Sequence, residues 1–235
     1  IPIAIDAGNR MVAAFRGVKM GFSFFLPSIQ LGCFGRLFNF IESFPRNRTD
    51  YFDIIMAGQL TGFALSLAAF AYGLVVTASG TGGSTFGELY PLVSPTLFDG
   101  SLLTHTMAAY LCPELIASKA TSMAVHPLVI TGYTGLLITS LNLLPIGKLD
   151  GGLLMQCMFG RLRSAFLSTG ALFISALSLI MHDSDVLFFW LLLVVLTQRN
   201  ATFPCKNESS GVDPARIALA FGLFALGASF LIPVF

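Results

Sequence analysis

The chain has 235 residues, of which 55% are hydrophobic and 11% are charged, and its mean hydropathy is +0.80. A soluble domain of this length does not carry so much apolar surface, so the composition predicts an integral membrane protein. The net charge of +1 excludes the basic field that nucleic-acid binding needs. The four cysteines lack CxxC spacing, so neither a zinc ribbon nor a disulfide framework is indicated.

The N-terminal part of the sequence predicts a helix over residues 1–16, followed by a Phe-rich stretch over residues 18–50. In residues 18–50 the phenylalanines are interrupted by Gly and Pro, which is typical of a β-hairpin or a re-entrant segment packed against helices. The chain lacks an initiator Met and begins inside an expected helix, so we expect a processed or truncated product.

Long apolar runs follow this segment. A helix needs about 20 residues to cross about 30 Å of hydrocarbon. The candidate membrane spans are residues 54–78, 125–144, 164–181, 186–197 and 215–235. We therefore expect an all-α polytopic membrane protein that forms a single membrane domain over residues 1–235.

The charges between these runs predict the topology. Basic residues such as Arg16 and Arg161 lie before the first span and beside the later ones, whereas Glu88, Asp99 and Asp183 fall in the alternate loops. By the positive-inside tendency, the basic loops face the cytoplasm or its equivalent.

The stretch 142–152, NLLPIGKLDGG, places the carboxylate of Asp150 inside apolar sequence. An ionisable side chain at membrane depth indicates a functional site. This stretch resembles the NxxPxxxLDG signature of site-2 proteases, the intramembrane zinc metalloproteases. The resemblance implies a site-2-protease-like helical core, with Asp150 at the position of a metal ligand.

Further blocks resemble the family in general or one branch of it, and residues 24–35 are among the blocks that resemble the branch. Residues 57–62, AGQLTG, are similar to the family's AGPxAG stretch, with Gln59 where Pro is usual. Residues 94–103 and 125–130 resemble blocks of the plastid branch named for ethylene-dependent gravitropism deficiency and yellow-green leaves. This resemblance implies a multi-pass protein of the thylakoid or another plastid membrane, connected with photosynthetic complexes.

The zinc-binding motif of the family departs from its pattern in this chain. In site-2 proteases an upstream helix carries HExxH, in which two His bind zinc and the Glu polarises a bound water. The best-matching segment has Ile5 and Asn9 at the His positions and Asp6 at the Glu position. Because Asp150 alone cannot supply three ligands, we expect no zinc and a structural role for Asp150, with Lys148 among its candidate partners.

Two histidines suggest another cofactor. A single imidazole in a membrane helix can ligate the magnesium of a chlorophyll without a paired ligand. We therefore take His105 and His126 as candidate chlorophyll ligands, with a structural role as the alternative for His126. The phenylalanines could line contacts with chlorophyll, carotenoid or lipid, although ordinary packing is their more common role.

Three functions are consistent with these residues. We favour a catalytically inactive, site-2-protease-like scaffold or structural subunit of a thylakoid complex, with photosystem or light-harvesting subunits as partners. The alternatives are an active intramembrane zinc endopeptidase with unusual ligands, and a pigment- or lipid-binding assembly chaperone.

Overall fold

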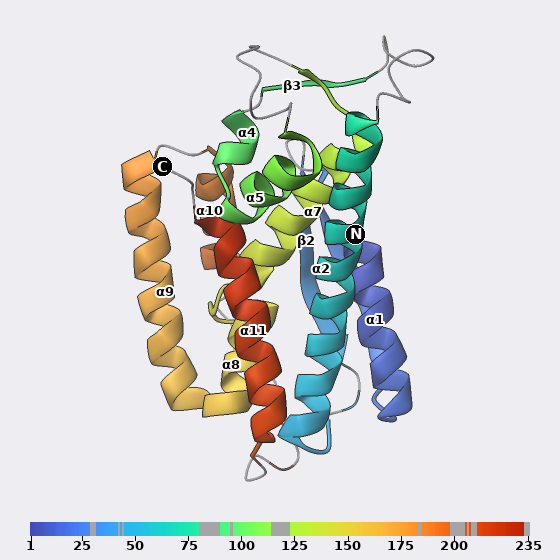
Figure 1. Ribbon diagram of the computed structural model, residues 1–235. Coiled ribbons are helices and arrows are strands. Elements are labelled where there is room, and N and C mark those ends of the chain that lie inside the picture. Colours follow the sequence, from blue (N-terminus) through green and yellow to red (C-terminus); the bar gives the residue numbers. More distant parts are fainter. Residues whose placement is uncertain are drawn as a thin grey trace. The chain divides into compact units, whose positions relative to one another are not determined.

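A computed structural model of the chain describes residues 1–28, 32–41, 43, 45–79, 90–94, 96–113, 123–182, 185–197, 205, 207 and 211–232. The helices, labelled as in Figure 1, are α1 (Pro2–Phe15), α2 (Arg48–Ala78), α4 (Thr96–Asp99), α5 (Leu102–Leu111), α7 (Pro127–Asn142), α8 (Asp150–Phe159), α9 (Arg161–His182), α10 (Asp185–Thr197) and α11 (Pro214–Leu231). The strands are β1 (Met20–Ser28), β2 (Gly32–Ile41), β3 (Leu92–Val93) and β4 (Met123–Ala124). The described chain is thus mainly helical, as the apolar runs predict.

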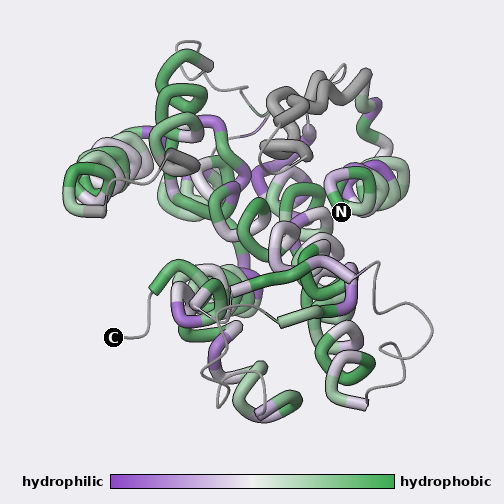
Figure 2. The backbone as a smooth tube through the Cα atoms, turned by 90° about the horizontal axis from the view of Figure 1, so that it is seen from above, coloured by the Kyte–Doolittle hydropathy of each residue, from purple (hydrophilic) through white to green (hydrophobic). Residues whose placement is uncertain are grey.

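Three helices in the described part of the chain are long and apolar enough to cross a membrane. They are Arg48–Ala78, Arg161–Met181 and Pro214–Leu231. Figure 2 shows that hydrophobic residues predominate in the helical coils, with hydrophilic residues between them. The runs predicted at 125–144 and 186–197 form α7 and α10, which have only 16 and 13 residues and fall short of a full bilayer crossing. As membrane spans, these two helices stay predictions.

The Phe-rich segment has the backbone of two antiparallel strands. β1 pairs with β2 from Met20 opposite Ile41 to Ser28 opposite Gly32, with irregularities of register between these ends. The placement of this segment within a membrane stays a prediction. The predicted topology also stays a prediction, because Glu88 and Asp183 lie outside the described residues.

The contacts within the chain group its residues into two compact units. The single membrane domain expected over residues 1–235 stays a prediction. The first unit contains Ile1 with residues 62–141 and 225–235. Within it, glycines bring α2 and α7 close together, since a Cβ on Gly73 would lie 2.7 Å from the backbone nitrogen of Val129. The Phe70 ring lies 6.1 Å from the Phe98 ring, centroid to centroid, and both side chains are fully buried.

The second unit contains residues 2–61 and 142–224. Within it, α1 packs on the first half of α2, and α8 packs against α9. Trp190 of α10 is fully buried here, being 1% exposed. This unit holds Ile5, Asp6, Asn9 and Asp150, the four residues that the sequence analysis compared with zinc-site motifs.

Candidate functional site

Helix α1 has one buried face, made of residues four apart. Ile5, Asn9 and Ala13 are 3%, 0% and 1% exposed. Residues at i and i+4 lie one above the other on a helix, so Ile5 and Asn9 share this face. Ile5 carries no donor atom, and the match of this helix to the HExxH motif stays a prediction.

Two glycines bring α1 and α2 into close contact. A Cβ on Gly8 would overlap the Thr61 hydroxyl, and a Cβ on Gly58 would overlap the side chain of Asn9. Small residues permit such close packing of membrane helices. The Asn9 amide therefore lies directly against the backbone of α2, one residue before Gln59.

Gln59 connects α2 to the start of α8. Its Nε2 donates a hydrogen bond to Oδ2 of Asp150 at 2.5 Å, and its side chain is fully buried. Asp150 is the first residue of α8, where the helix dipole favours a negative charge. The structure thus gives Asp150 a neutral amide donor from a different helix. Lys148, one of the candidate partners considered from sequence, stays a prediction.

The loop before Asp150 is held by the two glycines that follow it. A Cβ on Gly151 would overlap the carbonyl oxygen of Leu143, and one on Gly152 would lie 2.7 Å from that of Ile146. The loop therefore folds back onto the first turn of α8. Gly147, at a φ of 43°, donates its N–H to the Ser168 hydroxyl of α9 at 2.7 Å. The LDGG sequence thus fixes the position of Asp150 through close backbone packing.

Asn9, Gln59 and Asp150 form what we call the polar centre. Among the described residues, Asn9 Oδ1, Asn9 Nδ2 and Gln59 Oε1 are buried and make no hydrogen bond. An unpaired buried polar group costs about 1–3 kcal/mol, so three such atoms in one place are typical of a site that receives water or a ligand. The polar centre is therefore the strongest candidate site in the second unit.

Asp6 has a different neighbour. Its Oδ2 accepts a hydrogen bond from Arg10 Nε at 2.6 Å, within one turn of α1. Arg10 also donates through Nη2 to the carbonyl oxygen of Gly21 at the start of β1. The Asp6 carboxylate is thus engaged in an ion pair with Arg10, which also bonds to the strand after α1.

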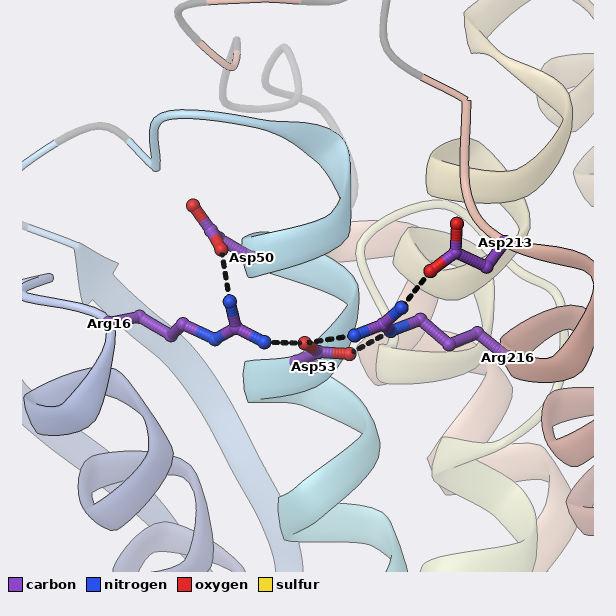
Figure 3. A network of polar contacts seen from close by, with 5 residues as sticks. All are labelled: Arg16, Asp50, Asp53, Asp213 and Arg216. Carbon is purple, nitrogen blue, oxygen red and sulfur yellow. Dashed lines mark hydrogen bonds and ion pairs between the residues drawn. The ribbon is translucent and has the colours of Figure 1, made fainter.

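A network of five charged residues joins three helices of the second unit at their ends (Figure 3). Asp53 of α2 accepts hydrogen bonds from Arg16, just after α1, and from Arg216 of α11, whose Nε lies 2.8 Å from Asp53 Oδ1. Arg16 also pairs with Asp50 at 3.0 Å, and Arg216 pairs with Asp213. The network fixes the end of α1 against the start of α2, two turns from Gln59.

The two candidate pigment ligands lie in the first unit and differ in their hydrogen bonds. His105 Nδ1 lies 3.0 Å from Asp99 Oδ1, which suits a proton on Nδ1 and leaves Nε2 with its lone pair. His126 Nδ1 instead accepts the N–H of Leu128 at 3.2 Å, so a neutral His126 carries its proton on Nε2. Ligation of a metal stays a prediction for both, and the geometry suits His105 better than His126.

The fold and the polar centre together define a class: a helical membrane protein with a partly buried carboxylate, in an NxxPxxxLDGG stretch, at the start of a helix. The comparison with protein families gives the same class. The chain belongs to peptidase family M50, whose model matches residues 11–181. The matched part includes Gln59 and Asp150, and it begins after Asn9.

Several curated proteins are similar to this chain. It is 36% identical over 220 residues to "Probable zinc metalloprotease EGY1, chloroplastic" of Oryza sativa subsp. japonica, covering 93% of this chain and 37% of that protein. It is 34% identical over 227 residues to "Probable zinc metalloprotease EGY2, chloroplastic" of Arabidopsis thaliana, covering 97% and 38%. It is 32% identical over 222 residues to "Probable zinc metallopeptidase EGY3, chloroplastic" of Arabidopsis thaliana, covering 91% and 38%.

The chain therefore spans less than two fifths of the length of these three relatives. No solved structure matches it. The predicted membership of the site-2 protease family, and of its plastid branch, is confirmed by the family model and by these relatives.

The comparisons correct three of the predictions. The inactive scaffold and the absence of enzymatic activity are contradicted, because the relatives are named as zinc metalloproteases and the family is one of peptidases. The expectation of no zinc is contradicted by the same names. The error came from treating Ile5, Asp6 and Asn9 as sufficient to decide the activity of the whole protein.

The polar centre does not by itself fit a zinc ion. Zinc in proteins prefers imidazole, thiolate and carboxylate ligands, and a catalytic zinc takes three of them. The centre offers one carboxylate with two amides, and in the part of the chain that the structure describes no group of three His, Cys, Asp or Glu residues lies close enough to hold a metal. We therefore derive no catalytic step through zinc from these residues.

Gln59 is the site residue that the sequence did not predict. The sequence marked it only as a departure from the usual Pro of the AGPxAG block. A signal was nevertheless present, because a glutamine inside a long apolar run requires a buried hydrogen-bonding partner. The sequence did not indicate that the partner of Gln59 is Asp150, 91 residues later in the chain.

Proposed function

We propose that the protein is a membrane-embedded peptidase that cleaves peptide bonds of other membrane proteins, and that the polar centre holds the segment to be cleaved. The observation that carries this proposal is the hydrogen bond from Gln59 to Asp150 beside the buried, unpartnered amide of Asn9. The relatives' names, which describe probable zinc metalloproteases, support the same reaction class.

Each residue of the centre has a role in this proposal. The Asn9 side chain carries an acceptor oxygen and two donor hydrogens, so it can pair with both the N–H and the C=O of an extended segment. Gln59 holds the Asp150 carboxylate in one orientation. Asp150 then supplies the charge of the centre, in apolar surroundings where a charge acts more strongly than in water.

The setting of the reaction follows from the relatives. Their names place them in the chloroplast, so we assign this protein to a plastid membrane, with several membrane-crossing helices. We further propose that the Phe-rich β1–β2 segment lies in that membrane as a hairpin. Photosystem and light-harvesting subunits are then the first membrane proteins to examine as substrates.

The test uses the full-length protein reconstituted in liposomes with solubilised plastid membrane proteins. New protein N-termini are identified by mass spectrometry for the wild type, for Asp150→Asn and for Asp213→Asn. Asp213 is the matched control, because its carboxylate is largely exposed and lies outside the polar centre.

We expect a set of new N-termini with the wild type and with Asp213→Asn that is missing with Asp150→Asn. No new N-termini with the wild type, or the same set with all three proteins, would refute the proposal.

A further inference from the structure

A side chain of α9 holds the loop that leads into Asp150. The N–H of Gly147, in the loop between α7 and α8, donates a hydrogen bond to the Ser168 hydroxyl at 2.7 Å. The bond is partly buried and joins residues 21 apart within the second unit. It therefore connects α9 to the loop three residues before Asp150.

The N–H of Gly147 takes its acceptor from outside the loop. The φ of Gly147 is 43°, in the left-handed region that glycine adopts readily. The loop's own turns are closed by the N–H of Ile146, which donates to the Leu144 carbonyl oxygen, and by that of Leu149, which donates to the Ile146 carbonyl oxygen. A partly buried N–H without an acceptor is unfavourable. The Ser168 hydroxyl therefore stabilises this conformation of the loop over others.

The same loop fixes the first turn of α8. A Cβ on Gly152 would overlap the carbonyl oxygen of Gly147, so the two backbones are in direct contact. Asp150 lies between these glycines in sequence and begins α8, where its Oδ2 accepts the hydrogen bond from Gln59. A shift of Gly147 would therefore move Asp150 relative to Gln59.

Open space beside the bond leaves room for such a shift. A cavity of about 280 Å³ is lined by Gly147, Gly152, Ser168 and Thr169, among other residues. In the part of the chain that the structure describes, this side of the loop is thus not closely packed. The hydrogen bond to Ser168 then keeps the loop in place where packing does not.

We propose that Ser168 is a positioning residue, which through Gly147 sets the place of the Asp150 carboxylate in the polar centre. This inference rests on the proposed peptidase function, because a displaced Asp150 changes the rate only if the polar centre cleaves peptides. Ser168 acts on the reaction through the backbone of the loop.

The test measures kcat and KM of the full-length protein in liposomes, with a purified plastid membrane protein that the wild type cleaves. Ser168→Ala removes the acceptor, whereas Ser168→Thr keeps it and adds a methyl group beside the cavity. Ser175→Ala is the matched control on α9, because the Ser175 hydroxyl donates to the Ala171 carbonyl oxygen of its own helix at 2.9 Å. Ser168→Ala is also combined with Asp150→Asn.

We expect Ser168→Ala to lower kcat about tenfold, since a misplacement of about 1 Å can lower a rate by as much as about 100-fold. KM should stay unchanged, because the groups that pair with the substrate are kept. Ser168→Thr should restore most of kcat, and Ser175→Ala should leave it unchanged. In the Asp150→Asn protein, Ser168→Ala should have no further effect on kcat, because the group that it positions is already lost.

A second measurement does not depend on activity. Hydrogen exchange of the backbone amides of residues 147–153, followed by mass spectrometry, should be faster in Ser168→Ala than in the wild type and unchanged in Ser175→Ala. If Ser168→Ala does not fold, Ser168→Cys replaces it in both measurements, because sulfur is only a weak acceptor. Its kcat should fall and its exchange should rise in the same way.

If the wild type cleaves, unchanged kcat or unchanged exchange in Ser168→Ala would overturn the positioning role and leave the proposed function standing. The same factor of loss from Ser168→Ala with and without the Asp150 carboxylate would also overturn it. No cleavage by the wild type would instead refute the proposed function, and the role of Ser168 with it.

Discussion

Gln59 of α2 donates a hydrogen bond at 2.5 Å to Asp150, 91 residues later in the chain and at the start of α8. The bond joins two parts of the chain that the family M50 model matches, inside one compact unit. Because Asn9 lies against Gly58, next to Gln59, the same short piece of α2 also positions the third member of the polar centre.

Asp150→Asn should cost less stability than Asp150→Leu. The Asn oxygen can still accept the hydrogen of Gln59, so we expect a loss of about 1 kcal/mol. Leu leaves the buried Gln59 donor without an acceptor, and the expected loss is about 1–3 kcal/mol more. Chemical unfolding in detergent, followed by the fluorescence of the buried Trp190, measures both values. Equal losses would show that the bond to Gln59 does not stabilise the fold.

Much of this unit could be predicted from sequence, for physical reasons that differ between residues. Ile5 and Asn9 share a helix face because of helical periodicity, and the NxxPxxxLDGG stretch marks Asp150 by placing a charge in apolar surroundings. The Gln59–Asp150 contact could not be predicted, because hydropathy and spacing carry no information on which distant polar groups meet. Activity could not be decided from Ile5 and Asn9 alone, and the comparisons overturned that inference.

Gly58→Ala should destabilise the packing of α1 on α2. The added methyl group would overlap the buried Asn9 side chain, and overpacking of this kind costs about 1–3 kcal/mol. Gly170→Ala on α9 is the control, since a Cβ there meets no atom within 4 Å. It should stabilise by about 0.5–1 kcal/mol through helix propensity. The same unfolding measurement compares the two, and similar effects of both changes would contradict close packing at Gly58.

Asp53→Asn should weaken the charged network more than Asp213→Asn. The Asp53 side chain is 17% exposed and accepts hydrogen bonds from both Arg16 and Arg216. We therefore expect Asp53→Asn to lower the free energy of unfolding by about 1.5–3 kcal/mol, the range for hydrogen bonds to charged groups. The Asp213 side chain is 64% exposed and pairs with Arg216. The loss of unfolding free energy in Asp213→Asn should therefore stay below about 1 kcal/mol. Unfolding at low and at high salt measures both, and a larger effect at Asp213 would be inconsistent with a network centred on Asp53.

Cys157 should react with maleimide far more slowly than Cys205. Burial raises the pKa of the Cys157 thiol, and the thiolate is the reactive form, so raising the pH from 7 to 9 should leave Cys157 nearly unreactive. Cys205 is partly exposed and should be labelled readily. Variants that keep one of the two cysteines, labelled in detergent and read by mass spectrometry, give the two rates. Fast labelling of Cys157 in folded protein would contradict its burial in α8.

The most direct measurement of the central claim is the rate at which purified full-length protein cleaves a membrane substrate, with and without the Asp150 carboxylate. If the polar centre is the site of peptide cleavage, Asp150→Asn should lower the rate by a factor of roughly 100 or more, the usual effect of removing a positioned catalytic group. The Gly170→Ala protein should cleave like the wild type. A folded Asp150→Asn protein that cleaves the same bond at the wild-type rate would contradict the account.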